Sequence, residues 1–342
     1  MDPEKRNKRQ IAGWLFLMCA MIFCMVIVGG VTRLTESGLS MVHWKPLSGV
    51  IPPLNETAWL KEFAAYKQYP EYQKINKGMS LADFKEIFFW EYSHRFLGRL
   101  IGLAFFIPFA FFLVKGRVSA GLKPKLWLMF FLGGLQGGLG WWMVKSGLVD
   151  HPDVSHYRLT AHLGLAVLIF LYIFWIATGL VMNKSPGNMG GSYEKSARAV
   201  VFLVWMIFFQ ILLGGLVAGL NAGMIYNSWP LMEEQWIPAG LYSMTPWYMN
   251  IFENIMTVQF NHRMLGYLIA LFAIHVWYKT QKDTGMQVRI AGHFMLVTVL
   301  GQGALGIFTL IYVVPIPLAA AHQGGAVVAL SAALFLLRRV KG

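Results

Sequence analysis

The sequence predicts an all-α integral membrane protein with eight transmembrane helices in two pseudosymmetric four-helix bundles. Three observations lead to this fold class: the composition, the spacing of apolar stretches and an internal repeat. The chain has 342 residues, of which 56% are hydrophobic and 13% charged, and its mean hydropathy is +0.52. Soluble domains are about half apolar and about a quarter charged, so this balance indicates a membrane protein.

Eight stretches of roughly 20 mostly apolar residues are each long enough to cross a bilayer. Because the lipid core offers backbone groups no water, each stretch should be a helix. The expected spans cover residues 12–33, 92–114, 125–144, 159–182, 198–219, 258–279, 290–312 and 318–338. No small-residue cleavage site follows the first stretch, which is also too long for a signal-peptide core, so we expect it to be retained.

Basic residues lie before the first span, after the eighth and in every second connection. The positive-inside rule assigns short basic connections to the cytoplasm, so both termini should be cytoplasmic. This distribution accounts for the net charge of +13 without nucleic acid, which we do not expect as a partner. The sequence has no Arg- and Ser-rich amphipathic leader, so the expected location is a bacterial cytoplasmic (inner) membrane.

The third observation is the internal repeat. Residues 28–31 (VGGV), which close the first span, parallel residues 213–216 (LGGL), which close the fifth. Residues 92–98 (YSHRFLG) parallel residues 260–266 (FNHRMLG). The offsets are 185 and 168 residues, so the first outer loop is about 17 residues longer than its counterpart. Four spans in each half give both halves the same orientation, with a pseudo-two-fold axis along the membrane normal.

The repeat divides the chain into two halves, residues 1–190 and residues 191–342, and each half should form a four-helix bundle. The glycine-rich residues 133–138 (GGLQGG) of the third span correspond to residues 301–306 (GQGALG) of the seventh. Two interpretations of these glycines are open. Small residues let helices pack closely, and they also leave room for a flat ligand against the backbone.

Four of the nine histidines lie a few residues inside the outer end of an even-numbered span: His94, His162, His262 and His322. Ionisable residues inside spans are expensive to bury and are functional by default. Neutral imidazole is a good axial ligand for heme iron, and two imidazoles on facing helices can hold a porphyrin in a four-helix bundle. The duplicated pattern therefore predicts one heme site in each half, and it fits a tetrahedral zinc site less well.

Glu91 makes the two expected sites different. It lies three residues before His94 on the same helical face, whereas the position that matches it before His262 is Gln259, which cannot ionise. This asymmetry predicts a reaction at the first site, with Glu91 as an acid, base or charge-stabilising group, and electron transfer at the second. The alternative is a carboxylate at a helix start that complements the helix dipole.

Other polar residues near the expected sites have less specific predictions. Arg95 and Arg263 each follow a candidate ligand and would contact heme propionates or anchor the helix at the membrane interface. The histidines of the outer loops are expected to be solvated or packed in loops, although a proton or metal role next to Asp150 stays open. These histidines are His43, His151 and His156.

Six motifs are spread over nearly the whole chain: residues 30–40 (GVTRLTESGLS), 91–95 (EYSHR), 157–162 (YRLTAH), 222–232 (AGMIYNSWPLM), 261–263 (NHR) and 321–323 (AHQ). Together they resemble the heme A synthase family. The two cysteines, Cys19 and Cys24, both lie in the first span. The chain is therefore similar to the branch without a cysteine pair in the first outer loop, which includes alphaproteobacterial and mitochondrial members.

The resemblance implies eight helices in two pseudosymmetric halves. It implies that His262 and His322 hold a heme B cofactor, while His94 and His162 flank the substrate heme O with Glu91 near the reacting group. The reaction would oxidise a methyl substituent of heme O to the formyl group of heme A in successive steps, and the product would serve terminal oxidases.

The partners expected from the resemblance are heme O as substrate, a heme O synthase that supplies it, and a membrane-bound or soluble electron-transfer protein. A homo-oligomer, formed with further copies of the chain, is also among the expected assemblies. The main alternative function is a di-heme b-type membrane cytochrome in quinone-linked electron transfer, which would carry two identical hemes. A transporter of heme or another small molecule is a third class, for which helices broken near the midplane would be expected.

Overall fold

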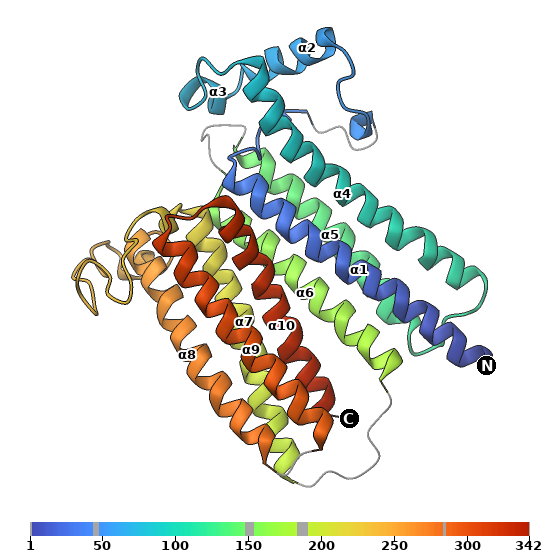
Figure 1. The fold of residues 1–342 in the computed structure, drawn as a ribbon. Helices are drawn as coiled ribbons and strands as arrows, with labels where there is room; N and C mark the ends of the chain where they lie inside the picture. Colours follow the sequence, from blue (N-terminus) through green and yellow to red (C-terminus); the bar gives the residue numbers. More distant parts are fainter. Residues whose placement is uncertain (1, 44–47, 148–153, 183–190, 283–284, 342) are drawn as a thin grey trace. The chain divides into compact units, whose positions relative to one another are not determined.

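The computed structural model describes residues 2–43, 48–147, 154–182, 191–282 and 285–341. The regular structure within them consists of ten α-helices and three short 3-10 helices, so the all-α prediction is confirmed for this part of the chain. Eight of the helices are long and follow the eight expected spans in order (Figure 1). They are α1 (Pro3–Leu34), α4 (Leu81–Val114), α5 (Lys123–Gly147), α6 (His156–Val181), α7 (Gly191–Gly219), α8 (Ile255–Gln281), α9 (Met286–Ile311) and α10 (Ile316–Lys341).

Six helices in the described part are long and apolar enough to cross a membrane, namely α1, α4, α6, α7, α9 and α10. The expected spans 125–144 and 258–279 fall on α5 and α8, which are not among the six. Helix α8 carries the polar run Gln259, Asn261, His262 and Arg263, which lowers its hydropathy. A multi-pass membrane protein follows from these helices, and the number of eight spans stays a prediction.

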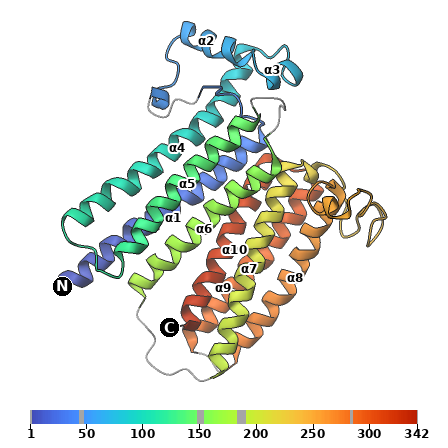
Figure 2. The same ribbon diagram turned by 180° about the vertical axis from the view of Figure 1, so that it is seen from behind.

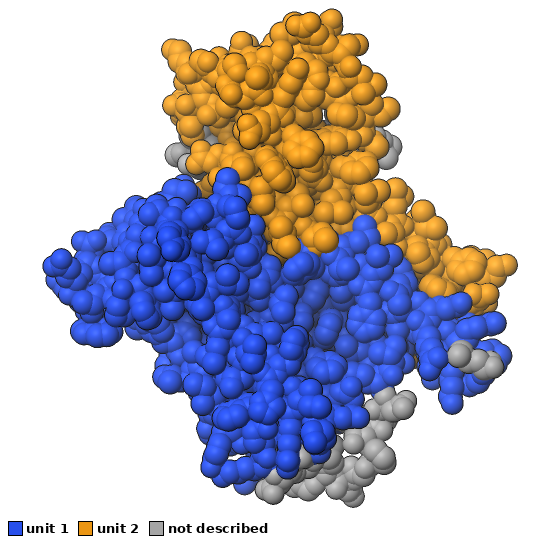
Figure 3. Space-filling view, in the orientation of Figure 1, with its two compact units in different colours: residues 1–23, 167–342 blue, residues 24–166 orange. Residues whose placement is uncertain are grey.

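The chain separates into two compact units (Figure 3): residues 1–23 with 167–342, and residues 24–166. This division by packing runs through α1 and α6. The halves expected from the sequence repeat, residues 1–190 and 191–342, stay a prediction.

In the first of these units, α7 packs against α8, α8 against α9, α9 against α10, and α10 back against α7. The four helices therefore close a ring, which is the arrangement of a four-helix bundle (Figure 2). Their facing surfaces bury Leu203, Met295 and Leu330, each without solvent exposure.

A small subdomain lies between α1 and α4 in the unit of residues 24–166, and we call it the outer subdomain because the sequence predicts that this connection is an outer loop. It contains η1 (Ser48–Val50), α2 (Glu56–Tyr66) and α3 (Pro70–Lys74), and α2 packs against α4. Aromatic and apolar side chains form its core: Met41, Val42, Phe63, Tyr66, Phe84 and Phe88. This subdomain occupies the extra length that the repeat offsets predict for the first outer loop.

Helix α4 begins with a capping box, in which Ser80 accepts from the Asp83 backbone N–H while the Asp83 carboxylate accepts from the Ser80 N–H. The helix starts thirteen residues before His94, whereas α8 starts only seven residues before His262. At 1.5 Å per residue, α4 extends outward about 9 Å further than α8 relative to its histidine.

Candidate functional site

Two of the predicted histidines meet in the bundle of α7–α10. The ring centroids of His262 on α8 and His322 on α10 lie 6.4 Å apart, with the ring planes at 82°. Two imidazoles on one metal ion, at about 2.0–2.1 Å per bond, have ring centres roughly 6 Å apart. The spacing therefore fits axial ligation of one iron between the two rings.

Each of these rings lies against a glycine of a neighbouring helix. A Cβ atom added to Gly214 on α7 would lie 3.3 Å from Cε1 of His262, and one added to Gly306 on α9 would lie 2.7 Å from Cε1 of His322. Any side chain at these positions would press on the imidazoles. The two glycines thus let the imidazoles lie close against the backbones of α7 and α9.

The same relationship occurs in the unit of residues 24–166. A Cβ added to Gly29 on α1 would lie 3.2 Å from Nε2 of His94 on α4, and one added to Gly140 on α5 would lie 2.9 Å from Cε1 of His162 on α6. Both histidines are partly buried, like the pair in the other unit. All four predicted histidines therefore face a glycine on an odd-numbered helix.

The glycines that face histidines correct one detail of the sequence comparison. Gly140 and Gly306 are 166 residues apart, so the predicted pairing of residues 133–138 with residues 301–306 is wrong by two positions. The error arose because both stretches contain several glycines, and sequence alone does not show which of them faces a ligand. A Cβ atom added to any other glycine of the two stretches would have no neighbour within 4 Å: Gly133, Gly134, Gly137, Gly138, Gly301 and Gly303.

Three glutamines that the sequence analysis missed contact three of the histidines. The Nε2 amide of Gln302 on α9 donates to the His322 carbonyl at 2.7 Å and lies 2.9 Å from Nδ1 of the same residue. Gln136 on α5 does the same to His162, with 3.0 Å to the carbonyl and 3.2 Å to Nδ1. Each amide therefore bridges the backbone and the ring of one histidine.

Gln210 on α7 makes the third of these contacts. Its Nε2 lies 2.9 Å from the His262 carbonyl and 3.3 Å from Nε2 of the ring. In each case the glutamine precedes the glycine that faces the same histidine by four residues. A repeated Gln-x-x-x-Gly pattern on three odd-numbered helices was the sequence signal that could have revealed them.

Glu91 is 2% exposed and is fixed by three groups. Its Oε2 accepts from the hydroxyl of Ser40 at 2.7 Å and from the backbone N–H of Met41 at 2.5 Å, and its Oε1 pairs with the Arg95 guanidinium. Arg95 also donates to the carbonyls of Met41 at 2.9 Å and His43 at 3.3 Å. The pair therefore holds the backbone segment that follows α1.

Gln259 occupies the position in the other half that matches Glu91. It binds backbone carbonyls, whereas Glu91 binds a backbone N–H. Its Nε2 donates to the carbonyls of Ala222 at 2.8 Å and Ile225 at 2.6 Å. Arg263 donates to the Gln259 Oε1 at 3.0 Å and to the Tyr226 carbonyl at 2.5 Å. Both residue pairs fix the segment after the first helix of their half, and only the first pair carries a carboxylate.

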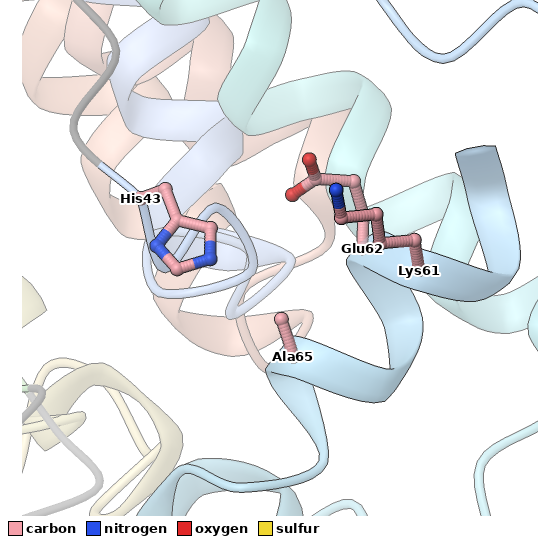
Figure 4. Close-up of a pocket in the computed structure, with 4 residues that line it drawn as sticks. All are labelled: His43, Lys61, Glu62 and Ala65. Atoms are coloured by element: carbon pink, nitrogen blue, oxygen red, sulfur yellow. The ribbon is translucent and has the colours of Figure 1, made fainter.

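Of the outer-loop histidines, His43 is exposed and lines a cavity of about 320 Å³ with Lys61, Glu62 and Ala65 of α2 (Figure 4). The imidazole faces α2 across this cavity, and it does not join His94 in any cluster of ligands among the residues described.

His156 begins α6, and its ring centroid lies 4.1 Å from that of Tyr157. Asp150 and His151, for which a proton or metal role was left open, lie outside the described residues. The remaining two histidines are both exposed: His275 and His293.

Comparison with known proteins identifies the family of the chain. The family model of the cytochrome oxidase assembly proteins, COX15-CtaA, matches residues 12–334. The chain is 50% identical over 340 residues to the heme A synthase of Parvibaculum lavamentivorans, covering 99% of this chain and 97% of the relative. It is also 50% identical over 340 residues to the heme A synthase of Nitrosospira multiformis, covering 98% of this chain and 94% of the relative. Matches of this extent and identity show that the chain belongs to the heme A synthase family.

Proposed function

We propose that this chain is a heme A synthase, an oxidoreductase that converts a methyl group of heme O into the formyl group of heme A for terminal oxidases. Membership of the family supports this activity. The observation that assigns this activity to particular residues is that each half contains two histidines, each of which faces a glycine. One such pair suffices for a resident heme, and the second gives the substrate heme its own place.

The resident cofactor is heme B, held by His262 and His322. Their ring separation of 6.4 Å and the glycines beside both rings support this assignment. A heme between two imidazoles supplies one-electron redox chemistry. The two side chains would hold its iron, and the closed ring of α7–α10 keeps their two helices within one bundle.

The substrate heme O lies between His94 and His162, with Glu91 beside its reacting group. With water as the oxygen source, oxidation of a methyl group to an aldehyde would release four protons and four electrons. The electrons would pass to the proposed electron-transfer protein, and a carboxylate near that carbon could accept protons or stabilise developing positive charge. The position of Glu91 on the same helical face as His94 supports this role.

Arg95 and Arg263 are proposed to approach the heme propionates. Their guanidinium groups already donate to backbone carbonyls, which fixes their orientation at the outer end of α4 and α8. A propionate would therefore meet a cation that is already positioned.

The protein is proposed to cross a bacterial cytoplasmic membrane eight times, with both termini in the cytoplasm and both heme sites toward the outer side. The basic residues at the ends of the chain and in alternate connections support this topology. A heme O synthase, an electron-transfer protein and further copies of this chain are the proposed partners.

One observation favours a second function, that of a di-heme b-type cytochrome in quinone-linked electron transfer. Both Glu91 oxygens are already engaged, by Ser40, Met41 and Arg95, as a purely structural carboxylate would be. In that case both sites would hold the same heme, and no porphyrin would be modified.

Heme extraction distinguishes the two functions. The protein is purified from a host that makes heme O, and its hemes are extracted in acid and separated by reversed-phase chromatography with mass detection. Heme B together with heme O, a hydroxylated intermediate or heme A is expected. Heme B alone, in a host shown to contain heme O, would contradict the proposal and favour the cytochrome.

A further inference from the structure

Four helices, α1, α5, α7 and α9, each carry a residue four positions before the glycine that faces a histidine, and one of these four residues differs from the rest. It is glutamine at three positions, Gln136, Gln210 and Gln302, and methionine at the fourth, Met25. Met25 precedes Gly29, and Gly29 faces His94.

Two glycines show that Met25 and Gln210 occupy equivalent places. Gly98 lies one turn after His94, and a Cβ there would lie 3.5 Å from Cε of Met25. Gly266 lies one turn after His262, and a Cβ there would lie 3.4 Å from Nε2 of Gln210. A thioether thus replaces a carboxamide in the first site.

We propose that Gln136, Gln210 and Gln302 are positioning residues that fix the rings of His162, His262 and His322, and that Met25 leaves His94 as the exchangeable ligand of the substrate site. The second part of this inference rests on the proposed function, because only a substrate site has to bind and release a heme in every turnover.

The contacts of the amides support the positioning role. A side chain that bonds both the backbone carbonyl and a ring nitrogen of one histidine restricts rotation of that ring. Metal-bound histidines usually give their second ring N–H to an acceptor such as a carbonyl oxygen, and loss of that partner weakens metal binding by about 10–100-fold.

The amide oxygens supply a second observation. The Oε1 atoms of Gln136, Gln210 and Gln302 are buried and have no hydrogen-bond partner among the described residues. Turning an amide by half a rotation exchanges its N–H donor for this acceptor. A glutamine turned in this way would accept from a ring N–H while the other ring nitrogen binds iron, in place of its bond to the histidine carbonyl.

His94 has no such partner. Within the described residues its ring takes part in no hydrogen bond, and the thioether of Met25 cannot donate one and accepts only weakly. The resident heme would thus have two supported ligands, His262 and His322. The substrate heme would have one ligand held by a glutamine, His162, and one without such a partner, His94, whose ring rotates and dissociates more easily.

The test exchanges the two residue types. Met25→Gln supplies the missing amide, while Gln210→Met and Gln302→Met remove one from the cofactor site. Loss of each heme from purified protein is followed by its transfer to excess apomyoglobin. Gln287→Met, on α9, is the matched control, because Gln287 binds Arg339 at an exposed position rather than a histidine.

We expect Met25→Gln to slow the transfer of heme A about tenfold or more while the low-spin heme B spectrum stays unchanged. Gln210→Met and Gln302→Met should speed the loss of heme B by about 10–100-fold, and the control should match the unmodified protein. Gln302→Glu, which keeps an acceptor, should retain heme B and lower its reduction potential. Retention of heme B in Gln302→Glu but not in Gln302→Met would show that the acceptor beside His322 is what supports the heme.

Wild-type transfer rates in Met25→Gln, or in both Gln210→Met and Gln302→Met, would overturn the inference. Failure of the proposed function is a different result: two hemes B and no heme O or heme A in the unmodified protein. The effect of Gln210 and Gln302 on the low-spin heme remains measurable in that case.

Discussion

Glu91 and Arg95, one helical turn apart on α4, form a buried ion pair that binds both an N–H donor and two carbonyls of the segment after α1. The corresponding pair of α8, Gln259 and Arg263, binds only carbonyls of its own segment. The carboxylate is therefore matched to a backbone donor, and the amide is matched to backbone acceptors. Part of the difference between the halves is structural, so a test of Glu91 has to separate folding from chemistry.

Glu91→Gln should abolish conversion of heme O to heme A while heme B is retained in the other unit. The amide has nearly the shape of the carboxylate, so the segment of Ser40 and Met41 keeps one acceptor, but the negative charge is lost. Product analysis by chromatography and the low-spin heme spectrum measure the two effects separately. Normal conversion in this variant would leave Glu91 with a structural role only.

Substitutions of Glu91 and Arg95 should have strongly non-additive effects on the free energy of unfolding. Breaking a buried pair by removing one partner costs about 3–5 kcal/mol, because the other charge stays buried. Glu91→Ala and Arg95→Met should therefore each destabilise strongly, and the double variant should lose less than the sum. Thermal unfolding of the four proteins in one detergent measures this coupling, and simple additivity would argue against it.

Gly306→Ala should displace heme B, because its Cβ would lie 2.7 Å from Cε1 of His322. We expect most of the low-spin heme B spectrum to be lost, as in His322→Ala. Gly303→Ala on the same helix is the control, since a Cβ there meets nothing within 4 Å. Equal heme content in the two glycine variants would contradict the assignment of the cofactor site.

Gly140→Ala should act in the same way on the substrate site and spare heme B. Its Cβ would lie 2.9 Å from Cε1 of His162, whereas Gly138 meets nothing within 4 Å and provides the control as Gly138→Ala. The expected result is a lower content of heme O and heme A with an unchanged heme B spectrum. Loss of heme B in Gly140→Ala alone would show that the two sites are assigned the wrong way round.

The outer subdomain should lose stability at high pH. Burial, with help from the nearby Glu71 carboxylate, raises the pKa of Tyr66, whose hydroxyl accepts from Asn76 at 2.8 Å. The folded state thus holds its phenol proton more tightly than the unfolded state, so stability is full below the ordinary tyrosine pKa of about 10 and falls above it. Unfolding measured from about pH 8 to pH 11 should show this slope, and Tyr66→Phe should reduce it.

The sequence was sufficient for features that depend on periodicity and duplication. The order of the long helices could be predicted from it, and so could the places of the four histidines on those helices, while the ligand roles of the histidines and the catalytic role of Glu91 stay predictions. Gln136 was missed, because it contacts a histidine 26 residues away on another helix and only the repeated Gln-x-x-x-Gly pattern points to it. The pairing of Gly140 with Gly306 was missed because several glycines lie near each of them in the sequence. Only the packing of the helices shows which glycine faces a histidine.

The continuity of α4 has a mechanical consequence. Phe84 and Phe88 belong to the core of the outer subdomain, and the same unbroken helix carries His94 further along. Ten residues of α-helix between Phe84 and His94 form a rod about 15 Å long. A protein that binds the outer subdomain and tilts it would therefore also displace the imidazole of His94, because both belong to one continuous helix.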